Sequence, residues 1–174
     1  MILGHGDIAR AIPAHLDRPS WVWFASGVSN SAETRESEYA REAQLLGVQD
    51  REAHLIYFSS LCVFYSNNRY ARHKGAMEDL VRNWFDAYTI IRLGTITWGR
   101  NPHLLINHLH AQHAAGLELD IQPVQRYVVD LAEFQNHLAL LPEWSCEYNI
   151  TGRRMTVQQI VDEYVVYRGV PAWK

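Results

Sequence analysis

The sequence predicts an α/β fold in which helices cover both faces of a mainly parallel sheet. Three strand-like runs, at 21–25, 54–60 and 88–97, alternate with segments of helical periodicity. These runs are largely apolar throughout rather than at every second position, as expected for strands that are buried on both faces. The chain has 174 residues, 48% of them hydrophobic, which is enough for one packed domain over 1–174.

The first elements follow from short apolar runs and helix breakers. Residues 1–3 are apolar and predict the first strand, and the helical pattern that follows is interrupted by Pro13. Trp21–Ala25 is expected to be a buried strand. Residues 33–47 predict a charged amphipathic helix with Gly47 as its C-cap.

The rest of the chain repeats this alternation. His54–Ser60 predicts an apolar strand, 70–87 has helical spacing, and 88–97 is rich in β-branched residues. The remaining expected elements are a helix at 103–115 that ends at Gly116, an extended segment at 117–129, a helix from Asp130 to about Leu141, a strand at 147–150 and a helix at 157–167 capped by Thr156.

Composition argues against several function classes. The formal net charge is −3 and no run of Lys or Arg stands out, so a nucleic-acid partner is not expected. No apolar run reaches the roughly 18 residues of a membrane span, and Met1–Leu3 leads into Gly4 without a basic leader. Cys62 and Cys146 form no metal-type pair. These features predict a cytoplasmic protein with no membrane partner.

Histidines cluster in and beside the helix expected at 103–115. They are His103, His108, His110 and His113. Only His110 and His113 share a helix face, and no carboxylate within the helix completes a ligand set. We therefore expect a polar or interface helix face and no metal site.

Tyr70 and Lys74 stand four residues apart in a predicted helix, ten residues after Ser60. Side chains at this spacing lie on one helix face. A lysine ammonium beside a phenol favours the phenolate and lowers its pKa from about 10. With a serine hydroxyl to hold a substrate oxygen, the set suits oxidation of an alcohol or reduction of a ketone. The same spacing is also common in helices without any catalytic role.

Small and polar residues stand where the predicted strands end. Gly4–Gly6, Ser26–Gly27, Ser59–Ser60 and Gly94–Thr95 would line the edge of the sheet at which ligands bind. The first of these turns would let a pyrophosphate approach the backbone closely, although a glycine turn with no ligand has the same pattern. Asp7 suits the helix dipole there but repels a phosphate.

The order of these motifs resembles the extended short-chain dehydrogenases/reductases, in particular the NAD-dependent nucleotide-sugar epimerases and dehydratases. ILGHGDIARAI is similar to the family's glycine-rich turn, HLIYFSSLCVF to its catalytic Ser/Thr strand, and YARHKGAMEDLV to its Y-x-x-x-K helix. Further segments that resemble the family, in the same order, are SWVWFASGVSNS, TIIRLGTITWGRNP, RYVVDLAEF and EYNITGRRMTVQQIVDEY.

The resemblance implies a Rossmann-like fold of about four or five mainly parallel strands, NAD or NADP as cofactor, and a sugar or nucleotide-sugar as substrate. It implies that Tyr70 is the general acid/base, that Lys74 lowers its pKa and touches the nicotinamide ribose, and that Ser60 orients the substrate. The positions it assigns to the cofactor are Gly4, Gly6, Asp7, Ile8, Ser26, Gly27, Lys74, Leu93, Gly94 and Thr95. The positions it assigns to the substrate are Ser60, Asn67 and Arg126.

One segment is much shorter than in that family. Asp17–Ser20 alone separates the first helix from the next strand, where family members have two further strands that cradle the adenosine. The sequence therefore predicts a trimmed fold whose first strand lies at the sheet edge. The place of the family's phosphate-gripping arginine holds Pro123, and Arg126 stands near it. A homodimer is expected to cover the open edge, and Trp173 is a candidate contact.

Two functions remain open from the sequence. Retention of Ser60, Tyr70 and Lys74 favours an NAD(P)-dependent oxidoreductase or epimerase-like enzyme. The missing adenosine half favours an accessory binding protein that keeps the fold and has lost dinucleotide binding.

Overall fold

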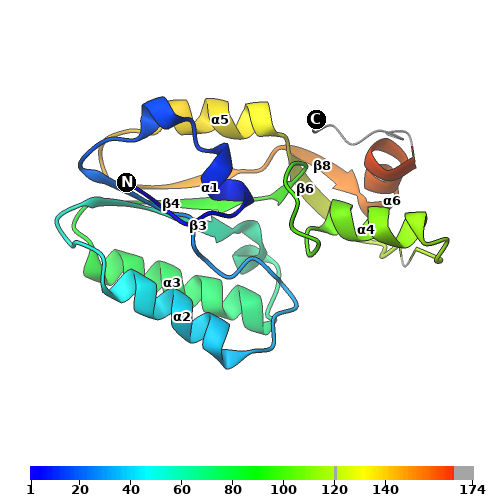
Figure 1. Ribbon diagram of the computed structural model, residues 1–174, viewed down its shortest axis with the longest axis horizontal. Helices are drawn as coiled ribbons and strands as arrows, with labels where there is room; N and C mark the ends of the chain where they lie inside the picture. Colours follow the sequence, from blue (N-terminus) through cyan, green and yellow to red (C-terminus); the bar gives the residue numbers. More distant parts are fainter. Residues whose placement is uncertain (120, 167–174) are drawn as a thin grey trace.

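Five parallel strands form the main sheet of the computed structural model, which describes residues 1–119 and 121–166 (Figure 1). Their order across the sheet is β1-β2-β3-β4-β7. These strands are β1 (Ile2–Leu3), β2 (Trp21–Phe24), β3 (His54–Ser60), β4 (Tyr88–Leu93) and β7 (Cys146–Ile150). The predicted trimmed Rossmann-like sheet, with a short first strand at its edge, is confirmed.

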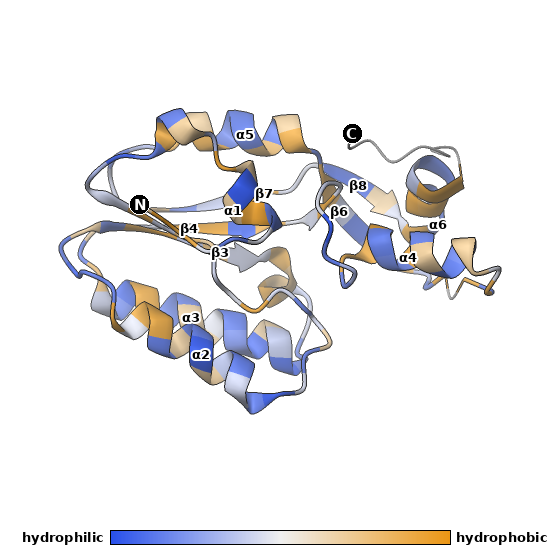
Figure 2. Ribbon diagram, in the orientation of Figure 1, coloured by the Kyte–Doolittle hydropathy of each residue, from blue (hydrophilic) through white to orange (hydrophobic). Residues whose placement is uncertain are grey.

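Helices cover both faces of this sheet, and this is why its central strands are apolar on both sides (Figures 1 and 2). One face carries α1 and α5, and the other carries α2 and α3 (Figure 1). The bounds are α1 (Asp7–Ala11), α2 (Glu36–Gly47), α3 (Arg69–Trp84) and α5 (Leu131–Ala139), with short 3-10 turns η1 (Ala14–Leu16) and η2 (Leu61–Phe64).

Each face of the sheet has its own apolar core. Trp23, Ile56 and Phe134 belong to the core on the α5 side. Phe24 and Met77 belong to the core beneath α2 and α3. Alternate residues of β2 and β3 enter opposite cores, so both strands are anchored on both faces of the sheet.

A smaller sheet of β5, β6 and β8 lies beside the carboxyl ends of the main strands (Figure 1). β5 pairs parallel with β6, and β6 pairs antiparallel with β8. Its elements are β5 (Thr95–Ile96), β6 (Gln125–Val129), β8 (Arg153–Thr156), α4 (Leu105–Ala114), α6 (Val157–Ile160) and the π-helical η3 (Val161–Val166). Helices α4, α6 and η3 share one apolar cluster with this sheet.

Side-chain caps fix the start of three helices. Asn68 accepts a hydrogen bond from Ala71 N at the start of α3. The predicted caps Asp130 and Thr156 are confirmed, and Thr156 forms a reciprocal capping box with Gln159.

Two boundaries in the main sheet and its helices differ from the sequence-based expectation. The strand predicted at 88–97 breaks at Gly94, because the chain there passes from the main sheet to the small one. A Cβ at Gly94 would lie 2.7 Å from Tyr127 O, so no side chain fits at this crossing. Gly47 is the last residue of α2 and not its cap, because Val48 holds that position.

The region after residue 117 was predicted least well. In the segment expected to be extended at 117–129, the strand within the described residues begins only at Gln125. Strand β8 was missed, and the helix expected at 157–167 is α-helical only to Ile160. The proposed contact at Trp173 lies outside the described residues. Within the described part of the chain, none of the helices has the length and apolar character needed to cross a membrane.

Candidate functional site

A cleft of 1380 Å³ lies at the carboxyl ends of the main-sheet strands, with residues of the small sheet and α4 on its other side. The predicted site residues that line it are Gly6, Asp7, Ile8, Ser26, Gly27, Ser60, Tyr70, Lys74, Leu93, Gly94, Thr95 and Arg126. Gly4 and Asn67 are not part of this lining, and Asn67 is exposed just before α3. The structure thus brings together residues from six separate segments of the chain.

The two glycines of the first turn, Gly4 and Gly6, differ in whether the backbone there requires glycine. Gly4 has φ +126°, and a Cβ on it would lie 2.5 Å from Ala25 O, so glycine is needed for the fold itself. Gly6 has an ordinary φ of −76°, and a Cβ there would meet nothing within 4 Å. Gly6 therefore leaves open space at the cleft rather than filling a structural need.

Asp7 ties this turn to the loop that follows β5. Its carboxylate accepts hydrogen bonds from the backbone of Arg100, at 3.1 Å, and of Asn101, at 3.0 Å. Gly99, with φ +103°, packs directly on the carboxylate, since a Cβ there would lie 2.4 Å from it. The Asp7 carboxylate thus pairs with backbone amides, and it holds the loop after β5 against the first turn.

Lys74 points inward from α3 and is 2% exposed. Its Nζ donates to Glu42 Oε1 at 2.9 Å, to Tyr57 OH at 3.1 Å and to Phe58 O at 3.4 Å. An ammonium group has three N–H donors, so these contacts use all of them, the last one weakly.

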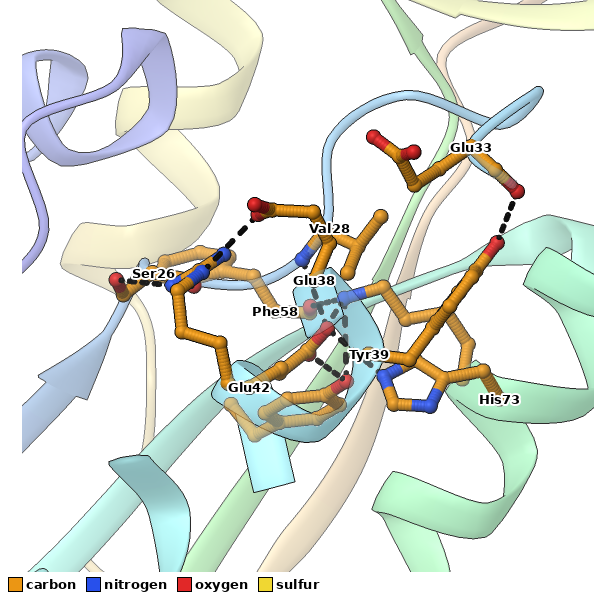
Figure 3. A network of polar contacts seen from close by, with 11 residues as sticks. Ser26, Val28, Glu33, Glu38, Tyr39, Glu42, Phe58 and His73 are labelled. Carbon is orange, nitrogen blue, oxygen red and sulfur yellow. Dashed lines mark hydrogen bonds and ion pairs between the residues drawn. The ribbon is translucent and has the colours of Figure 1, made fainter. Parts of the chain in front are cut away.

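Glu42, which the sequence-based reasoning missed, is the partner that holds Lys74. The carboxylate is fully buried and also accepts from Val28 N, at 2.7 Å, and from Tyr57 OH, at 2.7 Å (Figure 3). Burial would raise the pKa of Glu42, but the charge of Lys74 and the hydrogen bonds to the carboxylate together outweigh burial and hold the pKa below the ordinary 4.5.

A sequence signal for Glu42 existed. The buried residues of α2 are Tyr39, Glu42 and Leu46, at helical spacing on its inner face. On the charged amphipathic helix predicted at 33–47, this inner stripe contains one carboxylate between two apolar residues. An acidic residue on an apolar stripe indicates a buried partner.

Tyr70 lies on the cleft wall beside this pair, and Lys74 Nζ is 5.9 Å from the centre of its ring. The expectation that Lys74 lowers the pKa of Tyr70 is wrong. Burial, followed by the neighbouring Cys62 and Glu42, raises the pKa of the phenol well above 10. The charge of Lys74 is balanced by Glu42, so Tyr70 keeps its proton at neutral pH.

The two serines at the end of β3 have different surroundings. Ser59 Oγ donates to Glu78 Oε1 at 2.6 Å, inside a buried network with Arg92. Ser60 Oγ accepts from Cys62 N at 3.3 Å and caps η2. Ser60 is therefore the better placed of the two to offer its O–H to a molecule in the cleft.

The lining of the cleft is rich in basic side chains. These are Arg10, Arg41, Lys74, Arg100 and Arg126, together with His5, His103 and His108, whereas Asp7 is the acidic residue of the lining. Such a balance suits an anionic ligand. Among residues 1–119 and 121–166, no group of three or more His, Cys, Asp or Glu side chains is arranged to hold a metal ion.

Comparison with known proteins gives matches in structure alone. No protein-family model and no curated protein sequence matches the chain. The Bordetella bronchiseptica enzyme WbmG, solved with NAD and UDP, superposes with a TM-score of 0.62 at 17% identity, over 88% of this chain and 57% of WbmG.

Two further enzymes superpose comparably. UDP-glucuronic acid 4-epimerase from Bacillus cereus, solved with UDP-glucuronic acid and NAD, has a TM-score of 0.64 at 15% identity, over 82% of this chain and 57% of that one. dTDP-4-dehydrorhamnose reductase from Bacillus anthracis, solved with NADP, has a TM-score of 0.59 at 15% identity, over 83% and 62%.

The chain spans less than two thirds of each of these structures. The internal difference that the sequence shows lies between α1 and β2, where only a short connection with η1 is present. The superpositions nevertheless include 82–88% of this chain. The chain therefore has the fold of the extended short-chain dehydrogenases/reductases, in a shortened form whose main sheet begins at β1.

Proposed function

We propose that the protein is an NAD(P)-dependent oxidoreductase or epimerase-like enzyme that acts on a sugar or nucleotide-sugar. The observation that carries this proposal is that Ser60, Tyr70 and Lys74 line the same cleft as the Gly6 turn. The structural neighbours include enzymes solved with a nicotinamide dinucleotide and a UDP-sugar. The basic lining supports a ligand that carries phosphate.

The residues present fit the nicotinamide and pyrophosphate side of such a cofactor. Gly6 leaves open space where a Cβ would otherwise stand, which allows a ligand to approach the backbone. We assign this side to Gly6, Ile8, Ser26, Gly27 and the segment Leu93–Thr95. When bound, the dinucleotide would supply a hydride acceptor or donor for a sugar carbon.

The chain's own groups would move the proton. Tyr70, neutral because burial raises its pKa, can donate its proton to a ketone oxygen as that carbon is reduced. Ser60 would hold the same oxygen through its O–H. Lys74 would contact the ligand from the cleft wall. Its N–H that donates weakly to Phe58 O, at 3.4 Å, could donate to a ligand hydroxyl instead. We assign Arg126 to the substrate side, whereas Asn67 lies outside the cleft lining.

A turnover assay tests this proposal. The protein is incubated with UDP-glucuronic acid or UDP-N-acetylglucosamine and NAD, and NMR follows any change at the sugar carbons. Tyr70→Phe and Ser60→Ala are the test variants, since neither residue belongs to the hydrogen-bonded Glu42–Lys74 pair. Turnover that disappears with Tyr70→Phe supports the enzyme, and the absence of turnover with every sugar and cofactor contradicts it.

A second function, an accessory protein that binds a ligand without hydride transfer, is favoured by one observation. β1 is the edge of the main sheet, so within the described residues no strand stands where the adenosine of a dinucleotide would be cradled. Binding of UDP-sugars without dinucleotide binding would favour this function.

We further propose a cytoplasmic homodimer that covers β1, and a monomer in sedimentation would count against the dimer.

A further inference from the structure

We propose that Glu42 is a positioning residue for Lys74, and that it fixes the lysine ammonium in the cleft wall beside Tyr70. The inference rests in part on the proposed function, because Lys74 belongs to the residues assigned there. It adds Glu42 on α2 as the residue that keeps the ammonium of Lys74, on α3, in position.

The geometry of the carboxylate makes it a fixed anchor. Oε2 accepts from Val28 N at 2.7 Å and from His73 Nε2 at 3.0 Å. This oxygen is therefore held by α3 and by the loop that follows β2, at residues 25–32, which we call the cleft loop (Figure 3). Oε1 accepts from Tyr57 OH and from Lys74 Nζ. Both oxygens are therefore oriented, which gives the lysine a single place to bind.

Lys74 needs such an anchor because it is buried. An unpaired ammonium in an apolar interior is costly, and an ion pair with further hydrogen bonds offsets much of that cost. Glu42 supplies the negative charge, and Tyr57 and Phe58 supply neutral acceptors. Among residues 1–119 and 121–166, the other hydrogen-bond partners of Nζ carry no charge.

The cleft loop is built to admit this pair. A Cβ on Gly27 would lie 2.6 Å from Lys74 Nζ and 2.7 Å from Glu42 Oε1. Gly27 has no left-handed φ, so its lack of a side chain serves this close approach. Lys74 thus lines the cleft next to Gly27, where a ligand would contact it, whereas Glu42 stays fully buried.

Lys74 can still donate a hydrogen bond to a ligand although Glu42 balances its charge. Two strong contacts set the position of Nζ, and the 3.4 Å contact to Phe58 O leaves one N–H that a ligand oxygen can take over. Glu42 would therefore affect ligand binding through Lys74 and without touching the ligand.

The chain allows a direct test because it contains only two lysines, Lys74 and Lys174. In protein labelled with ¹⁵N at lysine Nζ, the substitution Lys174→Arg leaves Lys74 as the single source of signal. A buried, hydrogen-bonded ammonium exchanges its protons slowly with water and gives a resolved N–H signal. We expect this signal in the wild type, its loss in Glu42→Gln and its partial return in Glu42→Asp.

Glu38→Gln is the matched control, because Glu38 lies one turn earlier on α2 and pairs with Arg41 at 3.1 Å, away from the lysine. This variant should keep the Lys74 signal. An unchanged signal in Glu42→Gln overturns the inference. If Glu42→Gln fails to fold, Glu42→Asp decides, since it keeps the charge and withdraws the carboxylate by one methylene. A wild-type signal in Glu42→Asp would then overturn the inference.

Ligand binding gives the second readout. We expect Glu42→Gln to weaken NADH binding about tenfold, and the double variant Glu42→Gln/Lys74→Met to bind no more weakly than Lys74→Met. Additive losses would contradict action through Lys74. If the wild type binds no dinucleotide, the proposed function fails, while the lysine signal still decides whether Glu42 positions Lys74.

Discussion

The Nζ atom of Lys74 lies 2.9 Å from Glu42 Oε1, and the side chains are 3% and 0% exposed. This buried pair joins α3 to α2 beneath the cleft. Removing one partner of such a pair leaves an uncompensated charge in the interior, whereas removing both does not.

We predict that Lys74→Met lowers the free energy of unfolding by about 3–5 kcal/mol, because Glu42 is left unpaired. The double variant Glu42→Gln/Lys74→Met should lose clearly less than the sum of the two single variants. Urea denaturation of the four proteins measures these differences. Equal, additive losses would show that the two side chains contribute independently.

Acid should destabilise the protein through its paired carboxylates. Hydrogen bonds from Arg82 and Arg92, which overcome the effect of burial, lower the pKa of Glu147 from 4.5 to about 2. A carboxyl with a lowered folded pKa stabilises the protein above its unfolded pKa, and this contribution is lost as the pH falls towards the folded value. We expect the urea midpoint to fall between pH 4.5 and about 2, and to fall less in Glu147→Gln. An identical fall in the variant would contradict this role.

Asp7 should hold the loop after β5. Replacing it by Ala leaves two backbone amides without their acceptor, and we expect a loss of about 1–3 kcal/mol in unfolding free energy. The amide protons of Arg100 and Asn101 should also exchange faster with solvent. Asp50→Asn is the control, because Asp50 accepts from a different backbone amide, in the turn before β3. Unchanged exchange at both amides in Asp7→Ala would show that Asp7 does not hold the loop after β5.

Two glycines of the cleft should respond differently to alanine. Gly6→Ala should leave stability almost unchanged, because the new Cβ meets nothing within 4 Å. It should weaken dinucleotide binding if the ligand approaches there. Gly27→Ala should destabilise the fold, because its Cβ would displace the Glu42–Lys74 pair. Thermal unfolding together with NADH titration separates the two effects, and a stable Gly27→Ala protein would disagree with the observed packing.

The sequence was sufficient to predict the main sheet because its signals are local. The runs at β2, β3 and β4 are apolar throughout, and the caps Asp130 and Thr156 stand at helix starts, so their positions follow from neighbouring residues. The short β8 gives no such signal. It exists because Arg153–Thr156 pairs with the distant Gln125–Val128, and pairing of that kind cannot be seen in a window of sequence.

Three residues that the sequence singled out line one cleft, but the sequence did not predict the electrostatics around them. Ser60, Tyr70 and Lys74 could be found from their spacing and from the resemblance to a family. The partner of Lys74 could not be found in the same way, because Glu42 lies 32 residues away on another helix. The pKa of Tyr70 depends on burial and on this partner, so the expectation of a lowered pKa had the wrong sign.

We predict that a nicotinamide dinucleotide still binds in a cleft that lacks the adenosine strands. Calorimetric titration of the wild-type protein with NADH and with NADPH tests it most directly, with Gly6→Ala as the matched variant. We predict saturable one-to-one binding of one of the two cofactors, weakened in Gly6→Ala while the fold is unchanged. The absence of binding at millimolar concentrations of both cofactors would contradict the claim.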